Sequence, residues 1–194
     1  NALHHTSTLP CSILVFSIGG RDLNFPAIFH TIHQLASTHH KLIFAAAGND
    51  GPPRGSVLSP ADHPAVISIG ALTNQNTPLG SACRGFRTHF TQKLLPEFWM
   101  AGTKIPVFNP AGKCHEVSGS SIAAPLFAAF AALTMEKLKR ETGETGETGG
   151  GLSLGALRCR LHESCVFPNV LRVPNEEFPY FGSGLLCCLL GITT

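Results

Sequence analysis

The sequence predicts an α/β protein with a doubly wound parallel sheet and flanking helices. Three short runs of apolar and β-branched residues, at 12–18, 41–47 and 65–72, are typical of strands buried on both faces. The segment between the first two runs has helical spacing, and a strand–helix–strand unit with short connections implies parallel strands. The 194 residues, 43% of them hydrophobic, suffice for one domain with a sizeable core.

The elements follow in order along the chain. The first strand lies in CSILVFSIGG, which ends with Gly19 and Gly20. NFPAIFHTIHQLASTHHK then predicts a helix, with Asn24 as its N-cap and Pro26 in its first turn. Its apolar residues recur at helical spacing: Phe25, Ile28, Ile32 and Leu35. KLIFAAAGND predicts the second strand and AVISIGAL the third.

The second half of the chain is more varied. From Asn74 to Pro110 the pattern predicts loops with one or two short strands, and a long helix then follows Ser121 to about Lys139. Residues 141–151 repeat a Glu-Thr-Gly triplet, which predicts a flexible surface insertion. A further helix is expected in LGALRCRLHESC, inside a closing segment, 152–194, that ends with FGSGLL and an apolar tail. We expect one domain over residues 1–194.

Composition excludes several classes of function. The net charge is +2 and no Lys/Arg-rich patch occurs, so nucleic acid is not an expected partner. Seven cysteines without a CxxC pair argue against a zinc site, and the histidines of the first helix, His30, His33 and His40, are expected to be solvated. We therefore expect no metal and no cofactor. NALHHTSTLP is not a signal peptide, and the tail is too short to span a bilayer, so membrane attachment stays open.

The segment HEVSGSSIAAPLFAAFAALTMEKLKR carries the first candidate chemistry. Ser121 stands at the predicted start of a helix, where free backbone N–H groups and the helix dipole stabilise an oxyanion. Gly119 permits close approach of a substrate or of neighbouring backbone, and Ala123 and Ala124 leave room around the hydroxyl. In the alternative interpretation, Ser120 is only an N-cap and Ser121 an ordinary first-turn residue.

Two strand ends add to this picture. AAAGNDGP places Asn49 at the carboxyl end of a buried strand, where open α/β sheets bind ligands and where its amide could donate to an oxyanion. Gly-Asn-Asp-Gly is also ordinary turn chemistry. FSIGG ends another strand and leaves an edge to which an extended peptide could pair.

VFSIGG, IFAAAGNDGP, SPADHPAVISIGAL and VSGSSIAAPLFAAFAALT occur in this order, and together they resemble the catalytic domain of the subtilisin-like serine proteases (subtilases, peptidase family S8). The resemblance runs from Ile13 to Thr134, and YFGSGLL is similar to the family's closing turn. GNDGP, PAD and GKCHEVSGSSIAAP look most like the site-1 protease branch. The resemblance implies proteolysis of protein or peptide substrates and a location in the secretory pathway or outside the cell. It also makes calcium possible in a full-length protein.

Carried over residue by residue, the resemblance implies that Ser121 is the nucleophile and Asn49 the oxyanion-hole amide. Three groups of residues are implied in substrate binding: the strand Ser17, Ile18 and Gly19, the opposite wall Ala46, Ala47 and Gly48 with Leu58 near the floor, and Gly119 with Ser120 beside the nucleophile. This pocket suggests a small or medium apolar residue before the cut.

The chain departs from the family in one respect. The family's Asp-x-Gly and His-Gly-Thr motifs, which precede this region, do not occur here. We therefore expect either an N-terminally truncated domain or a degenerate homologue, inactive by itself in both cases. His63 and His115 are candidate replacement bases that we expect to be loop residues.

Three functions follow from these observations. The first is a serine endopeptidase acting through an acyl-enzyme at Ser121. The second is an inactive homologue or fragment that binds peptides or partners along the FSIGG edge. An esterase of the α/β-hydrolase class is disfavoured, because its nucleophile elbow requires Gly where Ala123 stands.

Overall fold

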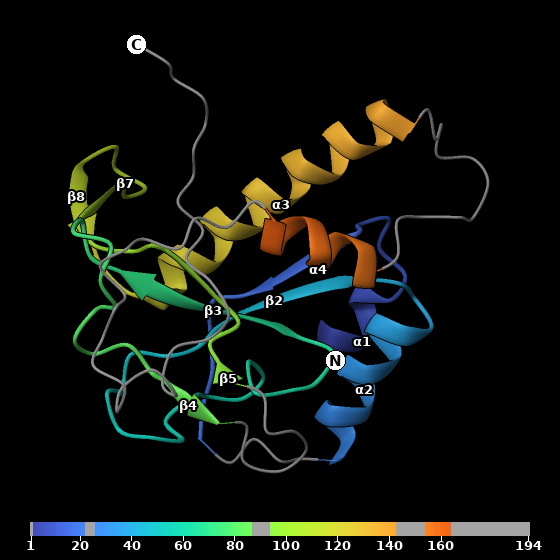
Figure 1. Ribbon diagram of the computed structural model, residues 1–194, viewed down its shortest axis with the longest axis horizontal. Helices are drawn as coiled ribbons and strands as arrows, with labels where there is room; N and C mark the ends of the chain where they lie inside the picture. Colours follow the sequence, from blue (N-terminus) through green and yellow to red (C-terminus); the bar gives the residue numbers. More distant parts are fainter. Residues whose placement is uncertain (1, 22–25, 87–93, 143–153, 164–194) are drawn as a thin grey trace.

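The computed structural model describes residues 2–21, 26–86, 94–142 and 154–163. Its centre is a four-stranded parallel sheet, which confirms the predicted fold class. The strands lie side by side in the order β1 (Ile13–Phe16), β2 (Leu42–Ala46), β3 (Ile67–Leu72) and β6 (Phe98–Ala101). Helices α3 (Ser120–Thr142) and α4 (Leu154–Glu163) cover one face, and α1 (Ala2–Thr6) and α2 (Pro26–Ser37) cover the other (Figure 1).

The core consists of two apolar layers, one on each face of the sheet. Alternate residues of a strand point to opposite faces, so Phe44 of β2 packs toward α3 while its neighbour Ile43 packs toward α2. On the first side Phe127 of α3 contacts Phe98 of β6, with 4.9 Å between the ring centroids. On the second side Ile32 anchors α2. Burial on both faces explains why these strands read as continuous apolar runs.

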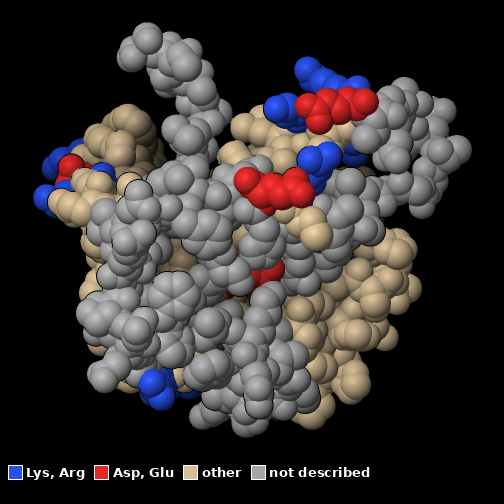
Figure 2. Space-filling view, viewed as in Figure 1, with Lys and Arg blue, Asp and Glu red and all other residues tan. Residues whose placement is uncertain are grey.

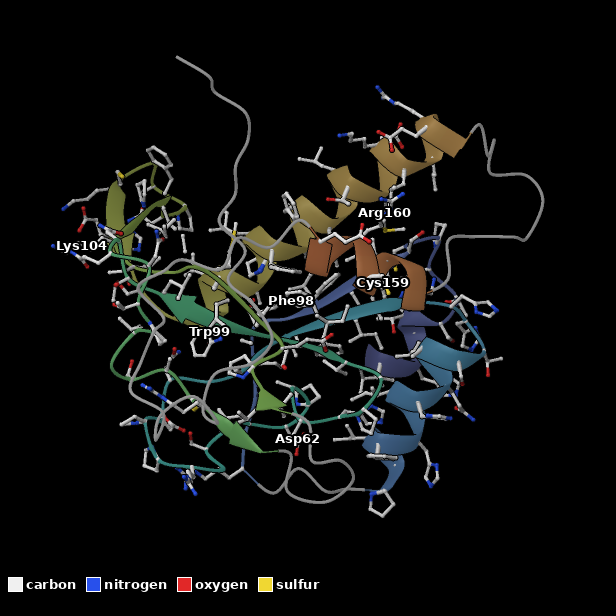
Figure 3. The ribbon with its side chains drawn as sticks, in the orientation of Figure 1. Asp62, Phe98, Trp99, Lys104, Cys159 and Arg160 are labelled. Carbon is white, nitrogen blue, oxygen red and sulfur yellow. The ribbon has the colours of Figure 1, made fainter. Side chains whose placement is uncertain are left out.

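The region between Asn74 and Pro110 is more regular than expected. We predicted loops with one or two short strands, and this is wrong, because the described residues there form four strands. Besides β6, they are β4 (Gly85–Phe86), β5 (Leu94–Leu95) and β7 (Ile105–Phe108), which pairs with β8 (Cys114–Val117) in an antiparallel hairpin. In Figure 3, Lys104 lies at the base of this hairpin, and Phe98 and Trp99 lie on β6. β6 escaped prediction because its apolar run FWMA is only four residues long.

Other boundaries agree within a few residues, with one exception. The predicted insertion begins at 141, but Glu141 and Thr142 belong to α3, and the residues from 143 to 153 lie outside the described part. The predicted N-cap Asn24 and most of the closing segment, including YFGSGLL, also lie outside it.

The longest helix, α3, is the central helix of the domain. By length and composition alone it could cross a membrane. It packs, however, against all four strands of the main sheet, with Ala124 and Phe127 fully buried. Its last turn carries the basic residues Lys139 and Arg140, and charged side chains gather at the upper right of Figure 2, where α3 ends in Figure 1. We therefore interpret α3 as a core helix, positioned with its N-terminus at the carboxyl edge of the sheet.

Candidate active site

The N-terminus of α3 meets the carboxyl ends of β1 and β2. Ser120, the first residue of the helix, is fully buried, and its hydroxyl oxygen accepts a hydrogen bond from the Gly48 N–H at 3.0 Å. The Ser17 hydroxyl, just after β1, donates to the Ser121 carbonyl oxygen at 2.8 Å. Three segments that are far apart in the sequence are thereby fixed around Ser121.

The Asn49 side chain is directly attached to the start of α3. Its Oδ1 accepts hydrogen bonds from the Ser120 N–H at 2.9 Å and from the Ser120 hydroxyl at 3.3 Å. Only the amide oxygen can accept these bonds, so the contacts fix the orientation of the amide and leave Nδ2 as the donor. The structure therefore holds Asn49 against Ser120, the residue before the predicted nucleophile Ser121.

Gly119 makes this approach of Asn49 possible. It has φ near +140°, a conformation that side chains rarely adopt, and its N–H donates to the Gly102 carbonyl at 2.7 Å. A Cβ atom placed on Gly119 would lie 2.9 Å from Asn49 Nδ2. Gly119 therefore leaves room for the Asn49 side chain, in addition to the close approach that its sequence context predicted.

Two groups of Ser121, its backbone N–H and its hydroxyl, make no hydrogen bond to any described residue. Its backbone N–H, in the first turn of α3, has no acceptor there, which is the usual state of N–H groups at a helix start. Its hydroxyl likewise makes no hydrogen bond to any described residue. An N–H group at a helix start is available to stabilise negative charge, and the hydroxyl contacts no base among the residues described.

Gly19 and Gly48, one from each predicted wall of the pocket, both lie against Leu58. A Cβ atom on Gly48 would lie 2.7 Å from Leu58 Cγ, and one on Gly19 would lie 3.0 Å from Leu58 Cβ. The Leu58 N–H donates to the Ala47 carbonyl at 2.9 Å, which pins the leucine beneath this wall. Ala46 and Ala47 are buried, whereas Ile18, two residues after β1, is 75% exposed. The residues predicted to form the pocket are thus neighbours in space.

The two candidate replacement bases are differently placed. His63 is buried, its Nδ1 accepts the Ala65 N–H at 3.0 Å, and its ring packs 4.2 Å from that of Phe29 on α2. This is the face opposite α3. His115 is exposed on β8 of the hairpin, in a strand rather than the loop we expected. Within the described ranges no group of three or more His, Cys, Asp or Glu residues is placed to hold a metal ion.

Sequence reasoning missed two supports of this site. The side chain of Ser17 holds the first turn of α3, whereas we had considered only its backbone. The only available signal was Pro125, which cannot donate the backbone hydrogen bond that the Ser121 carbonyl would receive in a regular helix. The second support is the contact of residues 81–83 with residues 48–51, hereafter the Asn49 turn. No sequence pattern indicates it.

Comparisons with known proteins agree with this geometry. The subtilase family model matches residues 11–158. Subtilisin-like protease SBT6.1 of Arabidopsis thaliana is 29% identical over 138 residues, which are 69% of this chain and 13% of that protein. Membrane-bound transcription factor site-1 protease of Homo sapiens is 24% identical over 144 residues, which are 72% of this chain and 14% of that protein. The chain thus spans a small part of the length of these relatives.

Solved structures share the fold. Prenylagaramide maturation protease PagA superimposes with a TM-score of 0.72 at 23% identity, over 95% of this chain and 62% of that one. The PatG macrocyclase domain gives a TM-score of 0.73 at 20% identity, over 94% of this chain and 52% of that one. Because the family model covers most of the chain and the fold agrees, the chain belongs to the subtilase family, the subtilisin-like serine proteases.

Proposed function

We propose that this chain supplies the nucleophile and the oxyanion hole of a serine endopeptidase whose substrates are proteins or peptides. The observation that carries the proposal is the attachment of Asn49 Oδ1 to the start of α3, which leaves its Nδ2 and the Ser121 N–H as neighbouring donors. Two fixed donors aimed at one developing charge are what an acyl-transfer site needs. Membership of the subtilase family supports the same reaction.

The reaction would proceed in two stages. A base takes the Ser121 proton as Oγ attacks the peptide carbonyl carbon, and the resulting oxyanion accepts hydrogen bonds from Asn49 Nδ2 and the Ser121 N–H. The C–N bond then breaks, and the leaving amine takes the proton back from the base. Water hydrolyses the acyl-enzyme by the same steps in reverse order. Because the Ser121 hydroxyl contacts no described histidine, we infer that the base and its carboxylate come from residues outside the described ranges.

The finer assignment is to proteolysis of the site-1 protease type in the secretory pathway. It is supported by the GNDGP, PAD and GKCHEVSGSSIAAP segments and by the similarity to the human site-1 protease. Leu58 between the two pocket walls favours a small or medium apolar residue before the cut.

The experiment uses the full-length polypeptide that contains this chain. We expect a fluorophosphonate probe to label Ser121, and Ser121→Ala to abolish labelling and peptide hydrolysis. Asn49→Ala should keep the nucleophile but slow hydrolysis by about 100- to 1000-fold, the usual effect of losing one oxyanion donor. Ser7→Ala, a change at an exposed serine of the N-terminal segment, is the matched control and should behave as wild type. Hydrolysis that persists in Ser121→Ala would refute the assignment of the nucleophile.

A second function has its own support. The Ser121 hydroxyl has no partner among the described residues, and β1 lies at the edge of the main sheet with Ile18 largely exposed. An extended peptide could therefore add to this edge without being cleaved. Binding of a peptide to the full-length polypeptide without probe labelling at Ser121 would favour this non-catalytic role.

A further inference from the structure

The Asn49 turn is held from two sides. On one side Ser120 binds Gly48 and Asn49, as described above. On the other side lies the segment Ser81–Cys83, which contacts the backbone of the same turn. The Cys83 N–H donates to the Gly48 carbonyl at 3.1 Å, and the Gly51 N–H donates to the Ser81 carbonyl at 2.9 Å. The residues before and after Asn49 and Asp50 are thus bonded to one segment.

Cys83 contributes its side chain as well as its backbone to this contact. The thiol is fully buried, and its Sγ accepts a hydrogen bond from the Asp50 N–H at 3.2 Å. Burial raises the pKa of the Cys83 thiol, although hydrogen bonds with Asp50 and Ser56 act in the opposite direction. The uncharged thiol is therefore the form present at neutral pH, and without this acceptor the partly buried Asp50 N–H would lose its hydrogen bond.

The fit around the turn is tight. A Cβ atom on Gly48 would lie 2.8 Å from Cys83 Sγ, and one on Gly51 would lie 2.0 Å from the Ala82 carbonyl oxygen. The turn therefore packs directly against residues 82 and 83, and a change of volume or hydrogen bonding at Cys83 is transmitted to the adjacent Asn49.

We propose that Cys83 is a positioning residue for the reaction at Ser121, because it holds the turn that aims the Asn49 amide at the oxyanion. This inference rests on the proposed function. Asn49 stabilises charge that exists only in the transition state, so a displaced Asn49 lowers kcat and leaves substrate binding almost unchanged. Cys83 touches neither the nucleophile nor the substrate in this proposal, and it acts through Asn49.

The kinetic test compares variants of the full-length polypeptide. We expect Cys83→Ala to lower kcat by about tenfold with KM unchanged, since one buried hydrogen bond is lost. Cys83→Ser keeps an acceptor and should restore most of the activity. In an Asn49→Ala background Cys83→Ala should have no further effect, because both act through one amide. An unchanged kcat in Cys83→Ala, or an equal further loss in the double variant, overturns the proposal.

A second measurement does not depend on activity. Amide hydrogen exchange at Asp50 should be about tenfold faster in Cys83→Ala than in wild type, because its N–H has lost the thiol acceptor. Cys114→Ala, at an exposed cysteine of β8, is the matched control and should leave this exchange unchanged. Unchanged exchange at Asp50 in Cys83→Ala overturns the positioning role. Absence of probe labelling at Ser121 in the wild type counts against the proposed function instead, so the two failures are distinguishable.

Discussion

Pro125 explains an unusual contact of the nucleophile. In a regular helix the N–H of residue 125 would donate to the carbonyl of Ser121, but proline has no N–H. The Ser17 hydroxyl donates to that carbonyl instead, at 2.8 Å. The missing N–H thus leaves the Ser121 carbonyl free to accept a hydrogen bond from Ser17, the residue directly after β1. Ser17 and Pro125 thus act together: the proline leaves the Ser121 carbonyl without a helical donor, and the Ser17 hydroxyl donates to it.

This hydrogen bond from Ser17 to Ser121 leads to a prediction for the full-length polypeptide. Ser17→Ala should lower kcat about two- to tenfold, the effect of one hydrogen bond worth about 0.5–1.5 kcal/mol. Adding Pro125→Ala supplies a backbone N–H to the same carbonyl and should recover part of the loss. Ser37→Ala is the control, because the Ser37 hydroxyl also donates to a helix carbonyl, at 2.8 Å, but on α2. Kinetics in which the double variant is worse than the sum of its parts would contradict this account.

Small residues at the start of α3 have a related cause. Ala123 and Ala124 are fully buried, and the Ala123 Cβ would lie only 3.3 Å from a Cβ placed on Gly102. The helix therefore approaches the sheet closely at the end where Ser121 stands. Larger side chains here would move the nucleophile away from Asn49. The composition GSSIAAP is thus a packing requirement of the site as well as a chemical one.

At the scale of elements, the sequence predicted β1, β2 and β3 but missed β6, which lies beside β3 at the end of the sheet order. β1, β2 and β3 are apolar runs bounded by turn residues, and α3 shows helical spacing over many turns. β6 is short and follows the buried, charged Glu97, so its pattern is ambiguous. Residues that carry motifs, such as Asn49 and Ser121, could be named in advance. The supporting hydrogen bonds of Ser17 and Cys83 could not be predicted, because their partners lie 104 and 33 positions away in the sequence.

Gly70 on β3 offers a test of how β6 is packed. A Cβ atom on Gly70 would lie 2.4 Å from Trp99 Cε3 and 2.8 Å from Pro96 Cγ, so the Trp99 ring occupies the space that a side chain would need. We expect Gly70→Ala to lower the free energy of unfolding by about 1–3 kcal/mol, as overpacking usually does. Gly80→Ala, where no atom lies within 4 Å of the added Cβ, is the control. Urea denaturation midpoints measure both, and equal midpoints would mean that β6 packs differently.

At the scale of the molecule, the apolar surface is unevenly distributed. All five residues of β2 are buried. The exposed apolar residues lie elsewhere. Val15 on β1 is 39% exposed, and Leu126 and Leu133, seven residues apart on the outward face of α3, are 37% and 63% exposed. These side chains thus belong to two elements that pack against each other, β1 and α3.

This surface and the missing base lead to one prediction for the 194-residue chain expressed alone. We expect no peptidase activity above that of Ser121→Ala, because no described histidine contacts the Ser121 hydroxyl and the family's Asp and His motifs do not occur in the sequence. We also expect the chain to bind a hydrophobic dye and to self-associate, since each large apolar side chain left in water forfeits up to about 1.5–3 kcal/mol of burial.

A double change, Leu126→Glu with Leu133→Glu, should reduce dye binding and association. The same pair of changes at Leu9 and Phe108, which are also exposed but lie on other segments, should reduce them less. A wild-type chain that is monomeric, melts cooperatively and shows Ser121-dependent turnover would contradict both halves of this prediction, and it would require a base within these residues.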